Sequence, residues 1–442
     1  MNAEVATIKT AAETALAQAY SQARARLPGD DAIAAQRAAA FDLFAKEGLP
    51  HRRVEDWKYT DLRALMRDAK PLAAPPDAAA KARAKAAGAL LGDVETRRLV
   101  FVDGAFVPEL SDTAALEPGL SIGSLADALA NGDPLLTAHL GKLAPASDVA
   151  VALNTALMGD GAVIRIAAGS TAGRPIHLLF VASEKPAATF VRSLVVVEKG
   201  ARAMLIESHE GPSGSDYQVN AAVEIFVGDE AHVDYVKIIG EGADALHVST
   251  LAAAIGARAR FNAFTFTAGG AVVRNQLFLK FDGEDTVAGI RGATLIKGRQ
   301  HADTTLVANH IARGCQSREV FKAVLDGEAH SVFQGRIIVR PGAQRTDAKM
   351  MTQALLLSER AEADNKPELE IFADDVQCGH GATSGALDDD LKFYLMARGI
   401  PAAEAEALLI RAFLGEAIEG IEHAGLREAL MDSVIAWLKA RG

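Results

Sequence analysis

The sequence contains very little cysteine, with only Cys315 and Cys378 among its 442 residues. Two cysteines cannot build a disulfide framework, so we expect a reducing compartment, the cytoplasm. Long apolar runs are also missing, and none approaches the roughly 20 residues that a membrane helix needs. The stretch from Met1 to Ala11 lacks a basic segment followed by an apolar one, so we expect no secretory signal.

Familiar catalytic motifs are missing too. The chain has no glycine-rich loop of a P-loop NTPase, no dinucleotide-binding Gly-x-Gly-x-x-Gly between strand and helix, no Gly-x-Ser-x-Gly nucleophile elbow and no His-Glu-x-x-His. These absences do not exclude an enzyme, but they favour a binding or scaffold role. The formal net charge of -11 argues against nucleic-acid binding, which needs a broad basic surface.

Three zones of the chain differ in composition. Residues 1–97 are rich in Ala, Glu, Lys and Arg, which favours helix, and apolar residues from Asp30 to Glu47 recur at helical spacing. Residues 98–387 contain short β-branched runs punctuated by glycine, which indicates strands. Residues 388–442 return to a helical pattern that begins at Asp388, a good N-cap residue. We therefore expect an N-terminal helical region, a β core and a C-terminal helical region.

Glycines in the middle zone recur at a nearly constant interval. The successive spacings are 31, 28, 28 and 27 residues, counted through Gly169, Gly200, Gly228, Gly256 and Gly283. The phase then slips, although Gly298 and Gly327 are again 29 residues apart. A fixed period with two strands per unit predicts a solenoid. The expected fold is therefore mainly β, a right-handed parallel β-helix flanked by helices; a large antiparallel sandwich is the alternative, which the period disfavours.

The segment around Cys378 and His380 carries the most distinctive chemistry. In an extended strand, residues two apart point to one side, and Gly379 and Gly381 leave room for a partner. Thiolate and imidazole are ligands of zinc and of iron–sulfur clusters, but a closed zinc site takes four ligands. Spacing alone also allows a buried cysteine beside a hydrogen-bonded histidine. If the pair does bind metal, another molecule supplies the remaining ligands.

Five segments spread along the chain match one known family. They are residues 53–60 (RVEDWKYT), 317–326 (SREVFKAVLD), 332–337 (VFQGRI), 366–371 (KPELEI) and 393–400 (FYLMARGI). In these segments the chain resembles the SufD family of the SUF iron–sulfur cluster assembly machinery. The likeness covers nearly the whole length and is strongest from His301 to Glu416. The paralogous SufB family usually reads His-Glu-Ala-Thr where this chain reads His380-Gly-Ala-Thr, which is similar to SufD.

The resemblance implies a cytoplasmic, non-catalytic scaffold that acts with SufB and the ATPase SufC. It implies a transient iron–sulfur cluster shared with SufB, with His380 as a ligand and Cys378 as a weaker candidate, and no cofactor bound tightly to the isolated chain. The C-terminal helices would dock SufC through Phe393, Tyr394, Leu395, Arg398, Leu409 and Phe413. The family is also linked to a reduced flavin on the complex, which no motif here locates.

Two other functions stay open. One is a SufB-like homodimeric cluster scaffold with two copies of His380 facing each other, since edge pairing of a β-helix allows a homodimer of the isolated chain. The other is a carbohydrate-active β-helix enzyme, for which we would expect a secretion signal and carboxylates clustered along one strand face. The sequence shows neither feature clearly.

Overall fold

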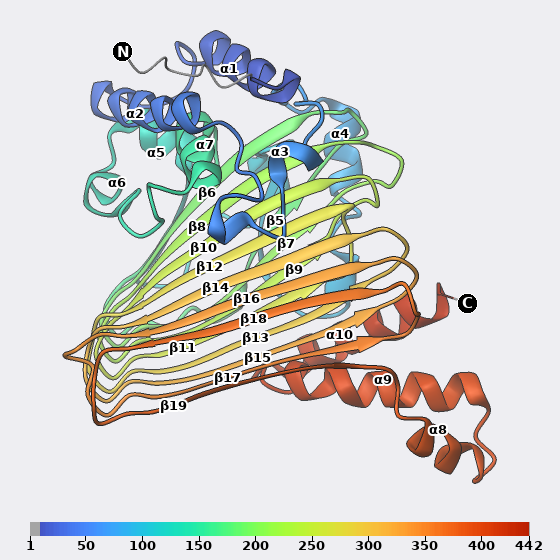
Figure 1. Ribbon diagram of the computed structural model, residues 1–442. Coiled ribbons are helices and arrows are strands. Elements are labelled where there is room, and N and C mark those ends of the chain that lie inside the picture. Colours follow the sequence, from blue (N-terminus) through green and yellow to red (C-terminus); the bar gives the residue numbers. More distant parts are fainter. Residues whose placement is uncertain (1–8, 442) are drawn as a thin grey trace, which may run out of the picture.

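The computed structural model describes residues 9–441, and strand residues (37%) outnumber helix residues (26%). Its centre is a parallel β-solenoid of about eight turns, with helices at both ends of the chain (Figure 1). Each turn of the solenoid contributes one strand to each of two sheets. The expected β-helix core with flanking helices is therefore confirmed.

The first sheet has nine strands: β3 (Leu120–Ser124), β4 (Ala162–Ile166), β6 (Ala188–Val197), β8 (Gln218–Val227), β10 (Leu246–Ile255), β12 (Val272–Phe281), β14 (His301–His310), β16 (His330–Val339) and β18 (Glu362–Ile371). The second has ten: β1 (Arg97–Val102), β2 (Ala105–Phe106), β5 (Ile176–Val181), β7 (Arg202–Glu210), β9 (His232–Gly240), β11 (Arg260–Thr267), β13 (Val287–Ile296), β15 (Gln316–Leu325), β17 (Asp347–Leu356) and β19 (Gln377–Gly385).

The coil length explains the glycine repeat. Residues paired in successive coils are 26 to 32 positions apart, from Leu246 with Val272 to His330 with Glu362. The first five glycines of the repeat lie where the chain turns from the nine-stranded to the ten-stranded sheet, whereas Gly298 and Gly327 lie on the opposite edge. The phase slip is therefore a change of edge. Packing of neighbouring turns demands glycine at Gly283, where a Cβ would lie 1.8 Å from the backbone nitrogen of Ala257.

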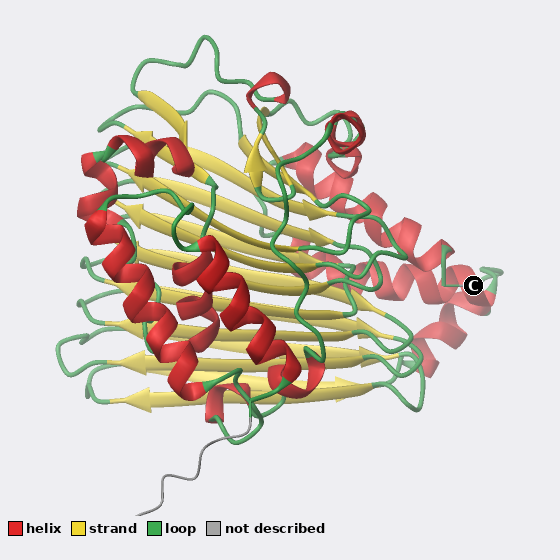
Figure 2. Cartoon of the chain, turned by 90° about the horizontal axis from the view of Figure 1, so that it is seen from above, coloured by secondary structure: helices red, strands yellow, loops and turns green. Residues whose placement is uncertain are grey.

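The helices of the N-terminal half are α1 (Ala11–Ala23), α2 (Asp31–Glu47), α3 (Leu62–Leu65), α4 (Ala78–Ala84), α5 (Leu125–Asn131), α6 (Pro134–His139) and α7 (Val149–Leu157). The helix expected from Asp30 to Glu47 is α2, and the side chain of its N-cap Asp30 accepts from the Ile33 amide at 3.0 Å. Figure 2 shows α1, α2 and α7 over one face of the solenoid, where they share a core with outward side chains of β10. In contrast, α4 packs on β1 and β5 of the ten-stranded sheet.

Three helices, α5 to α7, interrupt the zone that the sequence pattern assigns to strands. All nine residues of α7 (VAVALNTAL) are buried, between the nine-stranded sheet and α2. A helix covered on every side has no polar face and therefore no period of 3.6 residues. Its short apolar, β-branched sequence consequently reads like a buried strand.

The C-terminal helices are α8 (Asp389–Met396), α9 (Ala402–Ile418) and α10 (Ala424–Lys439). Residues of α9 and α10, such as Leu414 and Leu430, pack on outward side chains of the ten-stranded sheet, such as Phe266 and Val324. In contrast, α8 buries none of its residues and projects beyond the sheet (Figure 1). Within residues 9–441, no helix is both long enough and apolar enough to cross a bilayer.

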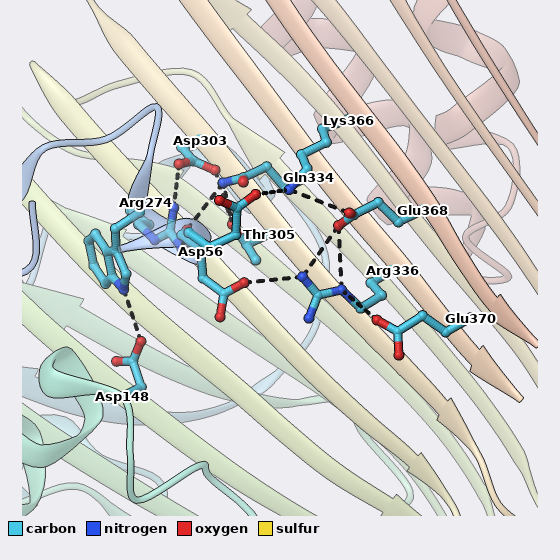
Figure 3. Close-up of polar contacts among 12 residues, drawn as sticks. Asp56, Asp148, Arg274, Asp303, Thr305, Gln334, Arg336, Lys366, Glu368 and Glu370 are labelled. Atoms are coloured by element: carbon cyan, nitrogen blue, oxygen red, sulfur yellow. Dashed lines mark hydrogen bonds and ion pairs between the residues drawn. The ribbon is translucent and has the colours of Figure 1, made fainter. Parts of the chain in front are cut away.

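The chain between α2 and α3 crosses the outer face of the nine-stranded sheet, where Asp56 lies beside Arg274 (Figure 3). Trp57 anchors the chain there. Trp57 is 2% exposed, lies with its ring 3.9 Å from the Arg274 guanidinium and donates its indole N–H to Asp148 at 3.0 Å. Arg274 pairs with Asp303 and donates to the Asp56 carbonyl oxygen at 2.6 Å. Removing one partner of such a buried pair typically costs about 3–5 kcal/mol.

A second, exposed set of ion pairs extends this anchor toward the last coils (Figure 3). Arg336 on β16 lies 3.3 Å from the carboxylates of both Asp56 and Glu368. Lys366 on β18 lies 2.5 Å from Glu55. Exposed pairs contribute roughly 0–1 kcal/mol each, so Trp57 and the buried Arg274–Asp303 pair provide most of the anchoring. Residues 53–60 thus form a strap that fastens the N-terminal helices to the solenoid.

We expect Trp57→Ala to lower the free energy of unfolding by about 3–5 kcal/mol, because it empties a buried site and uncovers Arg274. Limited proteolysis should then cut within residues 48–60, and urea denaturation should report the loss. Val54→Ala, on the same strap but 42% exposed, should stay within about 0.5 kcal/mol of the wild type. If residues 48–60 of the Trp57→Ala variant resisted protease as well as they do in the wild type, the anchoring role of Trp57 would be contradicted.

Candidate functional site

The solenoid ends at β18 and β19, and in the described chain each of them pairs with a strand on one side only. At the other end, antiparallel β2 and β3 close the sheets. The two open edges differ in sequence: β18 (EADNKPELEI) has Pro367 and alternating charges, whereas β19 (QCGHGATSG) has no Asp, Glu, Lys, Arg or Pro. Because proline and charge discourage edge pairing, β19 is the better template for a strand of another molecule.

Strand register places Cys378 and His380 on the side of β19 that continues the solenoid interior. Cys378 pairs with Ala348 and His380 with Met350, and both partners belong to the buried core. Since β19 has no further coil on it, Cys378 is half-buried and His380 is exposed. The structure therefore brings the two candidate ligands to one face, as the spacing predicts, and leaves His380 open to a second molecule.

The two side chains differ as ligands. Burial raises the pKa of the Cys378 thiol above its usual range, and the carboxylates of Asp347 and Glu319 act in the same direction. The thiolate is the ligand form of cysteine, so a raised pKa makes Cys378 the weaker metal ligand at neutral pH. This agrees with the lower rank that the resemblance gives it.

The surroundings of this pair favour close approach by a partner. No atom lies within 4 Å of the position that a Cβ at Gly379 would occupy. Apolar side chains stand exposed at the same end of the solenoid: Met351 at 40%, Ile371 at 42% and Phe372 at 55%. An open strand edge with apolar side chains around it is typical of an interaction surface.

Glu319 is a site feature that the sequence reading missed. It is fully buried on β15, in register with Met350 and hence in the same inward column as His380. Neither of its carboxylate oxygens has a hydrogen-bond partner within residues 9–441. Burial raises the pKa of Glu319 to about 7. The sequence did carry a sign that Glu319 points inward. Residues two apart in a strand share a face, and Glu319 lies two residues from both Ser317 and Phe321, which are buried.

The predicted docking residues occupy different settings. On α8, Phe393 is 71% and Tyr394 53% exposed, and the Arg398 guanidinium stacks 3.4 Å from the Tyr394 ring centroid. Leu395 and Leu409 are half-buried. Phe413 is also half-buried and packs against the core between α9 and the ten-stranded sheet, with the Lys322 ammonium 4.5 Å from its ring centroid. As docking residues all six remain predictions.

Comparison with known proteins identifies the family. The model of the SufBD core domain, "SUF system FeS cluster assembly", matches residues 180–413, and the model of the SufBD N-terminal region matches residues 10–178. The chain belongs to the SufBD family. The two SufBD models meet within β5, inside the solenoid, well after the change in composition near residue 97.

Relatives within the SufBD family include proteins named for iron–sulfur cluster assembly. A SufBD family protein of Synechocystis is 34% identical over 420 residues, which are 92% of this chain and 91% of the relative. SufD of Escherichia coli is 30% identical over 390 residues, 87% and 88% of the two chains. SufD of Bacillus subtilis is 27% identical over 288 residues, 64% and 65% of the two chains. These likenesses support a SufD-type member.

The pKa of Glu319 predicts how stability depends on pH. The folded pKa lies above the unfolded value, so the favourable contribution is complete below about pH 4.5 and is lost as pH rises through about 7. The loss approaches about 3 kcal/mol, because one pKa unit corresponds to about 1.4 kcal/mol. Urea denaturation at pH 5 and pH 8 should show this fall in the wild type and not in Glu319→Gln. The exposed Glu362→Gln should behave as the wild type; an unchanged pH profile in Glu319→Gln would contradict the assignment.

Proposed function

We propose that this chain is a non-catalytic scaffold subunit in iron–sulfur cluster assembly that acts with a SufB-type protein and a SufC-type ATPase. The observation that carries the proposal is the exposed His380 on the last, unpaired coil. A neutral imidazole is a good ligand for iron, yet one imidazole and a largely protonated thiol leave most coordination positions empty. The second molecule would supply the missing ligands, and the cluster is cargo that is held in transit.

The open edge of β19 indicates where the partner would bind. A SufB-type chain that adds a strand to β19 would continue the sheet and cover the exposed apolar side chains of Met351, Ile371 and Phe372. Main-chain hydrogen bonds would provide affinity, while His380 faces the partner across the junction of the two interiors. Gly379 lets the partner backbone approach because no side chain stands in the way.

The family membership favours this function over a carbohydrate-active enzyme. A homodimeric scaffold has one observation in its favour, because β19 is equally open to a second copy of the same chain. Anaerobic reconstitution of the isolated chain with iron and sulfide, read by visible absorption, separates the two functions. A stable, stoichiometric cluster on the chain alone would favour the homodimer.

We further propose that α8 docks the ATPase. Its exposed Phe393 and Tyr394 form an apolar surface, and only residues 386–388 separate α8 from the end of β19. Closure of two ATPase subunits on α8 would therefore act on the same strand that presents His380. ATP hydrolysis would then be coupled to opening of the cluster site.

His380→Ala should reduce cluster yield by at least about tenfold. Removing a residue that only hydrogen-bonds a metal ligand already costs about 10–100-fold in metal affinity or activity, and removing the ligand itself should cost no less. The measurement is iron and acid-labile sulfide per complex after co-expression with SufB and SufC, with size-exclusion chromatography to show that the complex is intact. Thr383→Ala, on the opposite face of β19, serves as the matched control. Unchanged cluster yield in an intact His380→Ala complex would disprove the ligand role.

Phe393→Asp should weaken SufC binding by roughly 30-fold or more, as expected when a central apolar contact worth about 2 kcal/mol is lost. Co-purification and titration with SufC provide the measurement, and SufB binding should persist. Leu65→Asp, at a 40% exposed position on α3, is the control for introducing a carboxylate at an apolar surface site. Retained SufC affinity in Phe393→Asp would place the docking surface elsewhere.

A further inference from the structure

A group of buried polar side chains lies inside the first half of the solenoid. Its central members are His209 on β7, Glu241 in the turn after β9 and His247 on β10, with side chains at most 2% exposed. Along the ten-stranded sheet, β9 is five strands from β19, or about 24 Å at the usual strand spacing. The group is thus separate from the candidate cluster site.

The three side chains converge on one point. The Oε1 atom of Glu241 lies 2.8 Å from Nδ1 of His247 and 4.0 Å from Nδ1 of His209. Each residue offers one ligand atom, and the three atoms lie within 4.8 Å of one another. Bonds of about 2.0–2.2 Å around a single ion place its ligand atoms roughly 3–4 Å apart. The observed separations need only small side-chain adjustments to meet that requirement.

An outer set of hydrogen bonds already orients these groups. Glu207 accepts from Nε2 of His209 at 2.7 Å, which leaves Nδ1 of His209 directed at Glu241. The Tyr217 hydroxyl donates to Oε2 of Glu241 at 2.6 Å. A carboxylate behind a histidine ligand and a hydrogen bond to a carboxylate ligand are the outer partners that metal sites use.

When both imidazoles are neutral, the charges inside the coil leave one carboxylate without a compensating positive charge. Glu207 and Glu241 contribute two carboxylates, and Lys237, 2.9 Å from Glu207, contributes one ammonium. His247 is fully buried, and its Nε2 has no hydrogen-bond partner within the described chain. An uncompensated carboxylate in a dry interior is costly, so a positive charge at Glu241 would stabilise the coil.

The cluster also has room for an additional ligand. A cavity of about 20 Å³ is lined by His209, Glu241 and Phe180 among others. A water molecule needs roughly 10–15 Å³ measured in this way, so one fits beside the two ligand side chains. Two imidazoles, a carboxylate and a water make up a four-coordinate site.

We propose that His209, Glu241 and His247 bind one divalent transition-metal ion of the Fe²⁺ or Zn²⁺ class inside the solenoid. Two nitrogen ligands and one carboxylate suit these ions, whereas Mg²⁺ and Ca²⁺ take oxygen ligands. Binding replaces the hydrogen bond from Nδ1 of His247 to Glu241 by two bonds to the metal. The displaced proton moves to Nε2 of His247, which has no partner in the described chain, so the ligand is a neutral imidazole. The site is independent of the proposed cluster role of His380.

The test uses the full chain without a histidine tag, treated with a chelator and then titrated anaerobically with Co²⁺. We expect one Co²⁺ per chain with visible ligand-field absorption, displacement by Zn²⁺, and a higher thermal midpoint in the loaded protein. Glu241→Gln keeps the size of the side chain but removes the anionic ligand, so affinity should fall at least about tenfold. His380→Ala should bind as the wild type, which separates this site from the last coil.

Two further variants test the metal site if Glu241→Gln does not fold. They change residues that hydrogen-bond the proposed ligands without being ligands themselves. Tyr217→Phe and Glu207→Gln leave the ligands in place and should weaken Co²⁺ binding about 10–100-fold. Substoichiometric metal in the wild type, even when Zn²⁺ is present throughout expression and purification, would overturn the proposal. Equal affinity of the wild type and a folded Glu241→Gln variant would overturn it too.

Discussion

Each coil of the solenoid satisfies its backbone hydrogen bonds with the coil before it and the coil after it, and the other features of the molecule depend on this stacking. At the N-terminal end, antiparallel β2 and β3 close the two sheets. At the other end, β18 and β19 keep N–H and C=O groups that no strand of residues 9–441 pairs with, which is an unfavourable arrangement for a free monomer. The exposure of His380 is a direct consequence, because the same inward position one coil earlier is the buried Met350.

The interior of the coil shows that burial alone does not set the state of a carboxylate. Burial by itself would raise the pKa of Glu207, yet Lys237, His209 and Tyr235 lower it below its usual range. Glu319 is equally buried, neither of its carboxylate oxygens has a hydrogen-bond partner within residues 9–441, and burial raises its pKa to about 7. Inward positions in the first half of the solenoid thus form a charged network, while the inward position on β15, two strands from β19, holds a carboxyl group whose pKa is about 7.

The sequence predicts those parts of the fold that follow from local repetition. Turn glycines and alternating strands recur with each coil, so the solenoid can be predicted from the sequence. Cys378 and His380 can be predicted to share a face because they lie two residues apart in one strand. The all-buried α7 has no helical period to detect. His209 and Glu241 are 32 residues apart, a spacing that means proximity only once the register of β7 and β9 is known. Contacts between coils are therefore beyond sequence reading, whereas contacts within a strand are not.

The position of α8 lets a force on this helix act on the open edge strand β19. The neighbouring helices α9 and α10 are held by an apolar core on the ten-stranded sheet, so they form one body with the solenoid. The short α8 has no buried residue and is linked to α9 by the ion pair between Lys392 and Glu406 at 2.9 Å. Its other connection is the chain itself, which reaches β19 within three residues. A force on α8 is therefore transmitted to β19, which in the described chain is held by backbone hydrogen bonds to β17 alone. A strand that is held on one side only is thus the strand that carries His380.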